Sequence, residues 1–494
     1  MAPTTENVPS KGEGHLEHRF SRLTMIGLTF GILNTWICLA GSLGIVMPSG
    51  GSVAFFYGFI FCVLCNLCLS ASVGELSSIW PTAGGQYHYT YALCNDNWKM
   101  LMSFSVGWIN IAGWLTLITT EAFFCAQFIS AAAVIGSDGA YVITPWKTYL
   151  IFLVVSTFTI LLNIFGYRIL NRWNEFALFW SVIGCLVVSI IVLATGEKTS
   201  AEFVFTNFSN STGWSDGMAW MLGLLQSALS LIGFDAVAHL TEEMKTPQRD
   251  SPQAMVAAVG IGGTTGIIFI LVMLFSLVDP ETILTTKTNS PVVELIYQAT
   301  KSKAATVVLS CALAVCFVNG TNGLSHITPG LNVPVRAILA AAVFNMLFGL
   351  LYLGPAVAFN AYCASCTIFL NLSYAIPVAL LLIRGRQLVS TSRPVFYLGH
   401  KKGYILNWVA VLFVFVTSIF FCFPGFLPVT TSNMNYVSAV LGIFIVFCTT
   451  LWFAKKGQYN GPQFEIILGE VPMINEDEMI IAKKEMQMQH KELV

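Results

Sequence analysis

Long stretches without any charged residue constrain this chain more than any other feature of its sequence. No Asp, Glu, Lys or Arg occurs at 25–74, at 337–383 or at 403–454. A helix needs roughly 20 consecutive apolar residues to cross a bilayer, so each of these windows is long enough for two spans. Charged residues make up 10% of the chain, whereas soluble proteins carry about 25%. The sequence therefore predicts an all-α, polytopic protein that lies in a lipid bilayer.

The charge balance excludes a second class of protein. The formal net charge is -1, with 24 Lys and Arg against 25 Asp and Glu. Nucleic-acid binding depends on a basic excess that neutralises phosphates. We therefore expect no nucleic acid among the partners of this chain.

The apolar windows and the turn residues between them predict twelve transmembrane helices. Their expected ranges are 25–47, 53–74, 101–132, 148–167, 175–195, 218–241, 254–278, 304–323, 336–353, 356–383, 404–423 and 435–454. The eighth span has the shortest apolar run, and a run of that length also fits a re-entrant segment. Without it, however, the basic loop at 384–402 would change sides, so twelve spans are kept.

The positions of Lys and Arg predict the orientation of the chain, because cytoplasmic loops carry an excess of basic residues. Most of the 24 bases fall on one side. The few on the other side are Lys147, Lys198, Lys287, Lys301 and Lys303. This count places both termini in the cytoplasm, and we expect the plasma membrane. The sequons at Asn207 and Asn210 then lie in an outer loop, where glycosylation is possible.

Cysteine spacing raises the question of a metal site. Cys62, Cys65 and Cys68 are spaced by three, as are Cys363 and Cys366. Both groups fall in the middle of predicted spans, with no His within ten residues, whereas metal sites need accessible ligands with supporting partners. Small residues spaced in this way usually pack membrane helices together. We expect no metal, no cofactor and no catalytic constellation, so the chain is not expected to be an enzyme.

Two of the predicted spans contain poor helix formers at membrane depth. The first span carries Asn34-Thr35-Trp36 near its middle, and the sixth carries Ile232-Gly233-Phe234 followed by Asp235. Interrupted helices that open two five-helix halves are typical of transporters with inverted repeats, where the freed backbone groups bind substrate. The alternative is that Gly and Ser only allow close packing of helices. The residues themselves favour neither of these readings.

Two motifs give the chain a family resemblance. Pro81-Thr82-Ala83-Gly84-Gly85-Gln86-Tyr87 follows the second span, and Gly233-Phe234-Asp235 is followed by Thr241-Glu242-Glu243-Met244-Lys245. With these motifs the chain resembles the amino acid–polyamine–organocation permeases, and within them the fungal amino acid, GABA and choline permeases. The resemblance implies a secondary active transporter of a small amine or amino acid, coupled to protons and working by alternating access.

The resemblance also implies roles for individual residues. The amides of Asn34, Thr35 and Trp36 would receive a substrate carboxylate, and the carbonyls of Ile232, Gly233 and Phe234 would meet an ammonium group. The aromatic ring of Phe234 would also suit a quaternary ammonium. The inner gate would include Glu75, Gly84, Gly85, Glu242 and Glu243.

Two carboxylates are predicted to lie deep in the bilayer, Asp235 and Glu121. An acid inside a membrane is a candidate functional residue, because burying it is costly. Asp235 has motif support as a proton-coupling or gating residue. The resemblance carries no acid to the place of Glu121, so a structural carboxyl competes there with a proton site. His239 lies four residues after Asp235, where it either pairs with that acid or faces the cytoplasm.

The predicted organisation follows from these elements. It comprises a cytoplasmic tail at 1–24, a first five-helix repeat at 25–195, an extracellular loop at 196–217, a second repeat at 218–383, two further helices with their loop at 384–454, and a cytoplasmic tail at 455–494. The stretch between the eighth and ninth spans is shorter than in the family, which leaves one alternative function: a permease-like nutrient receptor that does not transport.

Overall fold

The structure, a computed structural model, describes residues 22–165, 167–327, 335–354, 358–392, 394–431 and 433–462. Most of the two predicted tails and part of the stretch between the predicted eighth and ninth spans lie outside these ranges. In the described residues the backbone forms helices and connecting loops, with one isolated bridge between Ser49 and Asn210. The prediction of an all-helical, polytopic protein is confirmed.

Within the described residues, the first half of the chain forms nine helices. They are α1 (Arg22–Leu33), α2 (Thr35–Val46), α3 (Gly51–Ile79), α4 (Gln86–Leu93), α5 (Lys99–Gly136), α6 (Pro145–Phe165), α7 (Tyr167–Thr195), α8 (Ala201–Thr206) and α9 (Asp216–Leu229). A 3-10 helix follows α9, and the rest of the described chain is also built from helices. Its elements are η1 (Phe234–Glu243), α10 (Pro247–Phe275), α11 (Pro280–Leu284), α12 (Pro291–Thr300), α13 (Lys303–Ile327), α14 (Val335–Gly349), η2 (Leu350–Leu353), α15 (Ala358–Arg384), α16 (Gln387–Ser392), α17 (His400–Phe420) and α18 (Val437–Lys455).

Nine helical segments of the described chain are long and apolar enough to cross a membrane. Three shorter apolar helices accompany them, at Phe179–Thr195, Lys303–Val318 and Ile338–Leu353. These three fall where the fifth, eighth and ninth spans are expected. The helix expected at 304–323 continues to Ile327, so its inner end is longer than the sequence predicts.

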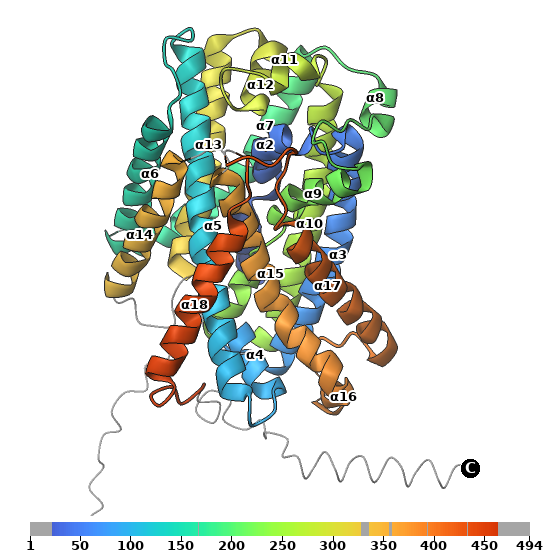
Figure 1. Cartoon of the computed structure of the whole chain (residues 1–494), viewed down its shortest axis with the longest axis vertical. Coiled ribbons are helices and arrows are strands. Elements are labelled where there is room, and N and C mark those ends of the chain that lie inside the picture. The colour runs from blue at the N-terminus through green and yellow to red at the C-terminus, as the bar shows by residue number, and fades with distance from the viewer. Residues whose placement is uncertain are drawn as a thin grey trace, which may run out of the picture.

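The long helices run roughly side by side, and several short ones lie at the two ends of the bundle (Figure 1). Helices α8, α11 and α12 lie at one end, whereas α4 and α16 lie at the other. The first three belong to loops predicted outside and the other two to loops predicted inside. The two groups of loops therefore lie at opposite ends of the molecule.

The longest helix, α5, lies at the centre and packs against both α13 and α15, while α10 packs against α3. Small residues allow α10 to approach its neighbours closely. A Cβ added at Gly262 would lie 2.5 Å from Thr35 Oγ1, and one at Gly266 would lie 2.6 Å from Phe59 Cζ. By contrast, α18 lies at the edge, where Ile443 and Val446 are 72% and 67% exposed. Such an apolar outer face is suited to lipid.

Candidate functional site

The first predicted span is interrupted at a single residue. Helix α1 ends at Leu33, and α2 begins at Thr35. Between them Asn34 has φ 48° and ψ 33°, the left-handed region that Asn tolerates better than most residues. The first N–H groups of a helix have no acceptor within it. The break therefore presents the free amides of the first turn of α2 near the middle of the span.

This interruption is shorter than the segment Asn34 to Trp36 that the sequence indicates. Thr35 and Trp36 already belong to α2. The side chain of Trp36 is buried away from the break, where its Nε1 donates to Ser181 Oγ at 2.8 Å and its ring meets Phe269 edge to face. Any contact of Trp36 with a solute would thus involve its backbone.

The sixth predicted span is interrupted over a longer stretch. Helix α9 ends at Leu229, and the 3-10 helix η1 begins at Phe234. Gly233 adopts φ 92°, which an L side chain would resist. Ile232 and Gly233 lie in the interruption, while Phe234 packs its ring 4.6 Å from that of Tyr374. The last carbonyls of α9 are used locally, since those of Gln226, Ala228 and Leu229 accept from the backbone amides of the three residues that follow. Within the described residues, the carbonyls of Ser230, Leu231 and Ile232, in the interruption itself, accept no backbone hydrogen bond.

The two interruptions lie next to each other. A Cβ added at Gly233 would lie 3.5 Å from Ile32 Cγ2, in the last turn of α1, and 3.9 Å from both Leu117 and Trp114 of α5. The two broken helices and α5 thus meet at one place, with free amides from one break and free carbonyls from the other.

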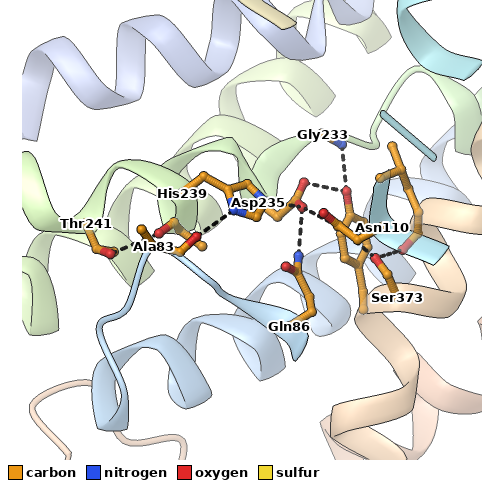
Figure 2. Close-up of polar contacts among 11 residues, drawn as sticks. Ala83, Gln86, Asn110, Gly233, Asp235, His239, Thr241 and Ser373 are labelled. Carbon is orange, nitrogen blue, oxygen red and sulfur yellow. Dashed lines mark hydrogen bonds and ion pairs between the residues drawn. The ribbon is translucent and has the colours of Figure 1, made fainter. Parts of the chain in front are cut away.

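Next to the two interruptions, Asp235 is the centre of a buried polar cluster (Figure 2). Gln86 Nε2 donates to Asp235 Oδ2 at 2.7 Å, and Asn110 Nδ2 donates to the same oxygen at 3.2 Å. Tyr374 donates its hydroxyl to Oδ1 at 2.6 Å, and His239 Nε2 lies 3.4 Å from Oδ2. The carboxylate is completely buried. Its partners come from α4, α5, η1 and α15, so one side chain ties four elements together.

The partners of Asp235 are themselves held in place. The hydroxyl of Tyr374 accepts from Gly233 N at 3.2 Å, and Asn110 also donates to Ser373 Oγ at 3.2 Å. His239 Nδ1 lies 2.9 Å from Ala83 O. The structure thus pairs His239 with Asp235 rather than leaving it facing the cytoplasm. The motif at 81–87 is joined to η1 through Gln86 and Ala83.

Glu121 lies on α5 beside the first interruption, where it is 2% exposed. Asn34 Nδ2 donates to Glu121 Oε2 at a long 3.4 Å and to Cys316 O of α13 at 3.2 Å. A Cβ added at Gly320 would lie 3.0 Å from Oε2. Glu121 and Asp235 therefore lie on different sides of the meeting point, and the two acids do not contact each other through these bonds.

Among the residues of the predicted inner gate, Glu75 has the most defined environment. Glu75 Oε1 accepts from Arg386 Nη2 at 2.7 Å and from Leu398 N at 2.9 Å. Arg386 also donates to Gly399 O at 3.2 Å, and both side chains of the ion pair are buried. The sequence indicates Arg386 only as a loop charge, because its partner lies 311 residues away. The sequence offers one weak signal for this pair, since Glu75 and Arg386 each stand at the inner end of an apolar run.

The other predicted gate residues lie at the same end of the bundle. Gly84 is packed so tightly that an added Cβ would overlap the ring of His88, and one at Gly85 would lie 3.5 Å from both Ala238 and His239. Glu242 and Glu243 close η1, but their side chains fall outside the described part. Within the described residues, no group of three His, Cys, Asp or Glu side chains is placed to hold a metal.

The two sequon asparagines differ in their surroundings. Asn210 Nδ2 donates to Trp214 O at 2.8 Å and to Asp216 Oδ1 at 3.0 Å, while its Oδ1 accepts from Thr212. Asn207 follows α8, and its carbonyl accepts from Val53 N at 3.3 Å. The amide of Asn210 is thus used within its own loop, whereas Asn207 is held through its backbone.

Comparison with known proteins gives a consistent result. A sequence model of the amino acid permease family matches residues 20–332 and 322–447. The choline transporter of Saccharomyces cerevisiae is 30% identical over 475 residues, covering 91% of this chain and 83% of that protein. The amino-acid permease BAT1 of Arabidopsis thaliana is 26% identical, covering 92% of this chain and 94% of its own. Amino-acid permease 2 of Neurospora crassa is 25% identical, with 90% and 86% covered.

The helical architecture and the match across most of the chain define a class, that of multi-pass membrane transporters rather than enzymes. Within that class, the chain belongs to the amino acid permease family, and the resemblance seen in its motifs is confirmed. The names of its relatives differ in substrate, so the family by itself does not select one.

Proposed function

We propose that this protein is a secondary active transporter that moves an amino acid or a related small amine, such as GABA or choline, across the membrane by alternating access. The observation that carries the proposal is the meeting of two interrupted helices. Gly233 lies against Ile32, so that amides at the start of α2 and the carbonyls of the second break, at 230–232, border one place. Free backbone groups of both signs at membrane depth are suited to a solute with an ammonium group and an oxygen.

The architecture that we propose has twelve transmembrane helices, two inverted repeats of five and two further helices. Nine long apolar segments and three shorter ones support this number. In this arrangement α1 and α2 together form the first span of the first repeat, and α9 and η1 together form the first span of the second. We also propose that the termini are cytoplasmic and that the protein lies in the plasma membrane.

We propose that Asp235 acts as a gating residue and that Glu121 binds and releases a proton. Asp235 is held by donors from three other elements, which suits a latch that must be undone before the inner side opens. Glu121 receives a long bond from Asn34 beside the break, which suits a carboxylate whose partner changes during the cycle. Coupling to protons would operate through one or both of these acids.

The alternative, a nutrient receptor that does not transport, rests on a shortened eighth span. Helix α13 has 25 residues and continues to Ile327. Its length supports a complete span and so favours transport over a purely sensory role.

The proposal is tested by uptake into proteoliposomes and into yeast that lacks its own permeases. We expect saturable uptake of at least one amino acid, GABA or choline, stimulated by an inward proton gradient. Asp235→Asn should reduce the maximal rate at least tenfold while the protein still reaches the membrane. Binding of a solute without any flux would instead support the receptor.

A further inference from the structure

Glu121 lies where the first broken helix resumes. Its Oε2 accepts from the side chain of Asn34, the residue that immediately precedes α2. Helix α13 encloses it on another side, since the same Asn34 amide also donates to Cys316 O and Gly320 lies against the carboxylate. A carboxylate therefore stands beside the N-terminal turn of α2.

The N-terminus of a helix carries a partial positive charge and attracts anions. A solute with its own carboxylate would be drawn to this place, with its ammonium group directed at the carbonyls of the second break. Here the protein supplies a carboxylate of its own. A second carboxylate at the same place would meet a like charge in a region of low dielectric constant. An ammonium group would instead find an unlike charge.

We infer that Glu121 takes the place of a substrate carboxylate and makes this site selective for small cationic amines that lack one, the class that includes choline and polyamines. The inference rests on the proposed function and specifies its substrate. Zwitterionic amino acids are the disfavoured class, because they bring a carboxylate to an occupied position.

A second observation lies two turns away on the same helix. Trp114 is 4% exposed, lies beside Gly233, and its Nε1 has no hydrogen-bond acceptor among the described residues. Residues seven apart on a helix face the same way, about 10 Å from each other. An aromatic ring attracts an alkylated ammonium. Its free N–H can donate to a hydroxyl. Between Glu121 and Trp114, the ammonium group of an aminoalcohol cation thus has the carboxylate and the aromatic ring as partners, and its hydroxyl group has the indole N–H.

The first test compares two solutes on the unmodified full-length protein. Choline and glycine betaine share a trimethylammonium group, but betaine carries a carboxylate where choline carries a hydroxymethyl group. We expect choline to raise the melting temperature of the purified protein at a concentration at least ten times lower than betaine. Equal or stronger stabilisation by betaine overturns the inference. This measurement requires no transport, so its failure is distinct from failure of the proposed function.

The second test uses uptake of labelled choline with unlabelled competitors in permease-deficient yeast. In Glu121→Gln, the half-inhibitory concentrations of choline and putrescine should rise at least tenfold, while those of GABA and alanine should fall, because the like charge that opposes their carboxylates is removed. Glu121→Asp should restore part of the preference for cations. The matched control is Glu197→Gln, an exposed acid in an outer loop, which should behave as the wild type.

Two results of the second test contradict the inference. One is a wild-type protein that takes up GABA or alanine in preference to every cation tested. The other is a Glu121→Gln variant in which all competitors weaken by the same factor, which would show a structural carboxyl. If that variant does not reach the membrane, the choline and betaine comparison on the wild type decides alone.

Discussion

At the scale of single residues, one buried ion pair of this protein is held by several partners. Glu75 and Arg386 form an ion pair without exposure to solvent, and backbone groups of Leu398 and Gly399 complete it. With the amide of Asn407 turned so that its oxygen faces the guanidinium, that oxygen accepts from Arg386 Nη1 at 2.8 Å. The pair joins the inner end of α3 to the segment between α15 and α17.

The Glu75 and Arg386 pair gives a prediction about stability. Removing one partner of a buried ion pair leaves an uncompensated charge and costs about 3–5 kcal/mol, while replacing both costs much less. We expect Arg386→Met to lower the melting temperature in detergent strongly and the double variant Glu75→Gln, Arg386→Met to recover part of the loss. Lys402→Met, at an exposed lysine, serves as the control. Additive losses in the double variant would show that the pair contributes no coupling.

His88, in the loop helix α4, predicts a dependence of stability on pH. Burial, with a smaller contribution from nearby His239, lowers the pKa of His88 from its ordinary 6.5 to about 4. The folded protein therefore holds His88 neutral. Its contribution to stability is complete above pH 6.5 and is lost as the pH falls from 6.5 towards 4, because the unfolded chain binds the proton first.

We expect the melting temperature in detergent to fall by a few degrees between pH 7 and pH 5, and to fall less in His88→Gln. The comparison concerns the slope with pH, since the variant also loses the 2.7 Å contact of His88 with Thr82 and starts from a lower stability. Parallel curves for the two proteins would assign the pH dependence to other groups.

At the scale of the elements, the two helix interruptions are built from different residues. Asn34 turns the chain at one position, whereas the second break needs the residues from Ser230 to Gly233. Both rely on left-handed backbone, with φ 48° at Asn34 and 92° at Gly233. For an ordinary L residue this conformation costs roughly 1–2 kcal/mol.

Substitutions at Asn34 can separate backbone shape from side-chain chemistry. Asn34→Gly keeps the left-handed turn but removes the bonds to Glu121 and Cys316. Asn34→Ala removes the same bonds and also disfavours the left-handed turn. We expect Asn34→Gly to change the affinity for substrate with little loss of stability, and Asn34→Ala to lose about 1–2 kcal/mol in addition. Uptake kinetics and melting temperature measure the two effects. Equal stability of the two variants would show that the turn itself is not strained.

The sequence indicates these breaks well because their signals are local. Asn34 and Gly233 stand inside otherwise apolar runs, and a poor helix former there is visible without any knowledge of the fold. The cluster around Asp235 is different. Gln86, Asn110 and Tyr374 are 149, 125 and 139 residues from Asp235 along the chain, so their convergence depends on how the helices pack. Only His239, four residues away, could be foreseen as its partner.

At the scale of the whole molecule, the loops of the two ends test the proposed orientation. The predicted outer loop contains Asn207 and Asn210, and the second of these has its amide engaged in two hydrogen bonds. We expect glycosylation at Asn207 in preference to Asn210. A mobility shift on treatment with a glycosidase should therefore disappear in Asn207→Gln and persist in Asn210→Gln. A persistent shift in the double variant would place the sugar elsewhere and weaken the proposed topology.

The molecule is also closed above the meeting point of its broken helices. Towards the Gly136 end of α5, Phe124 stacks on Phe317 of α13 at 5.0 Å and meets Phe359 of α15 edge to face at 4.8 Å. All three rings are buried, and Gly41 of α2 packs against Phe124. With the Asp235 cluster on the other side, the place between Glu121 and Gly233 is covered from both ends. Transport through this arrangement requires these rings to separate.

Buried thiols report on that separation. Cys316 and Cys363 are 2% and 0% exposed, and the carbonyl of Cys316 accepts from the same Asn34 amide that donates to Glu121. A charged, membrane-impermeant thiosulfonate added outside should inactivate the protein slowly in the cold, where the rings stay packed. At 30 °C the rate should rise several-fold, and excess choline should protect. The double variant Cys316→Ala, Cys363→Ala should lose this sensitivity. Rapid inactivation in the cold would mean that the outer side is open at rest, because a reagent of that size cannot pass between stacked rings without their movement.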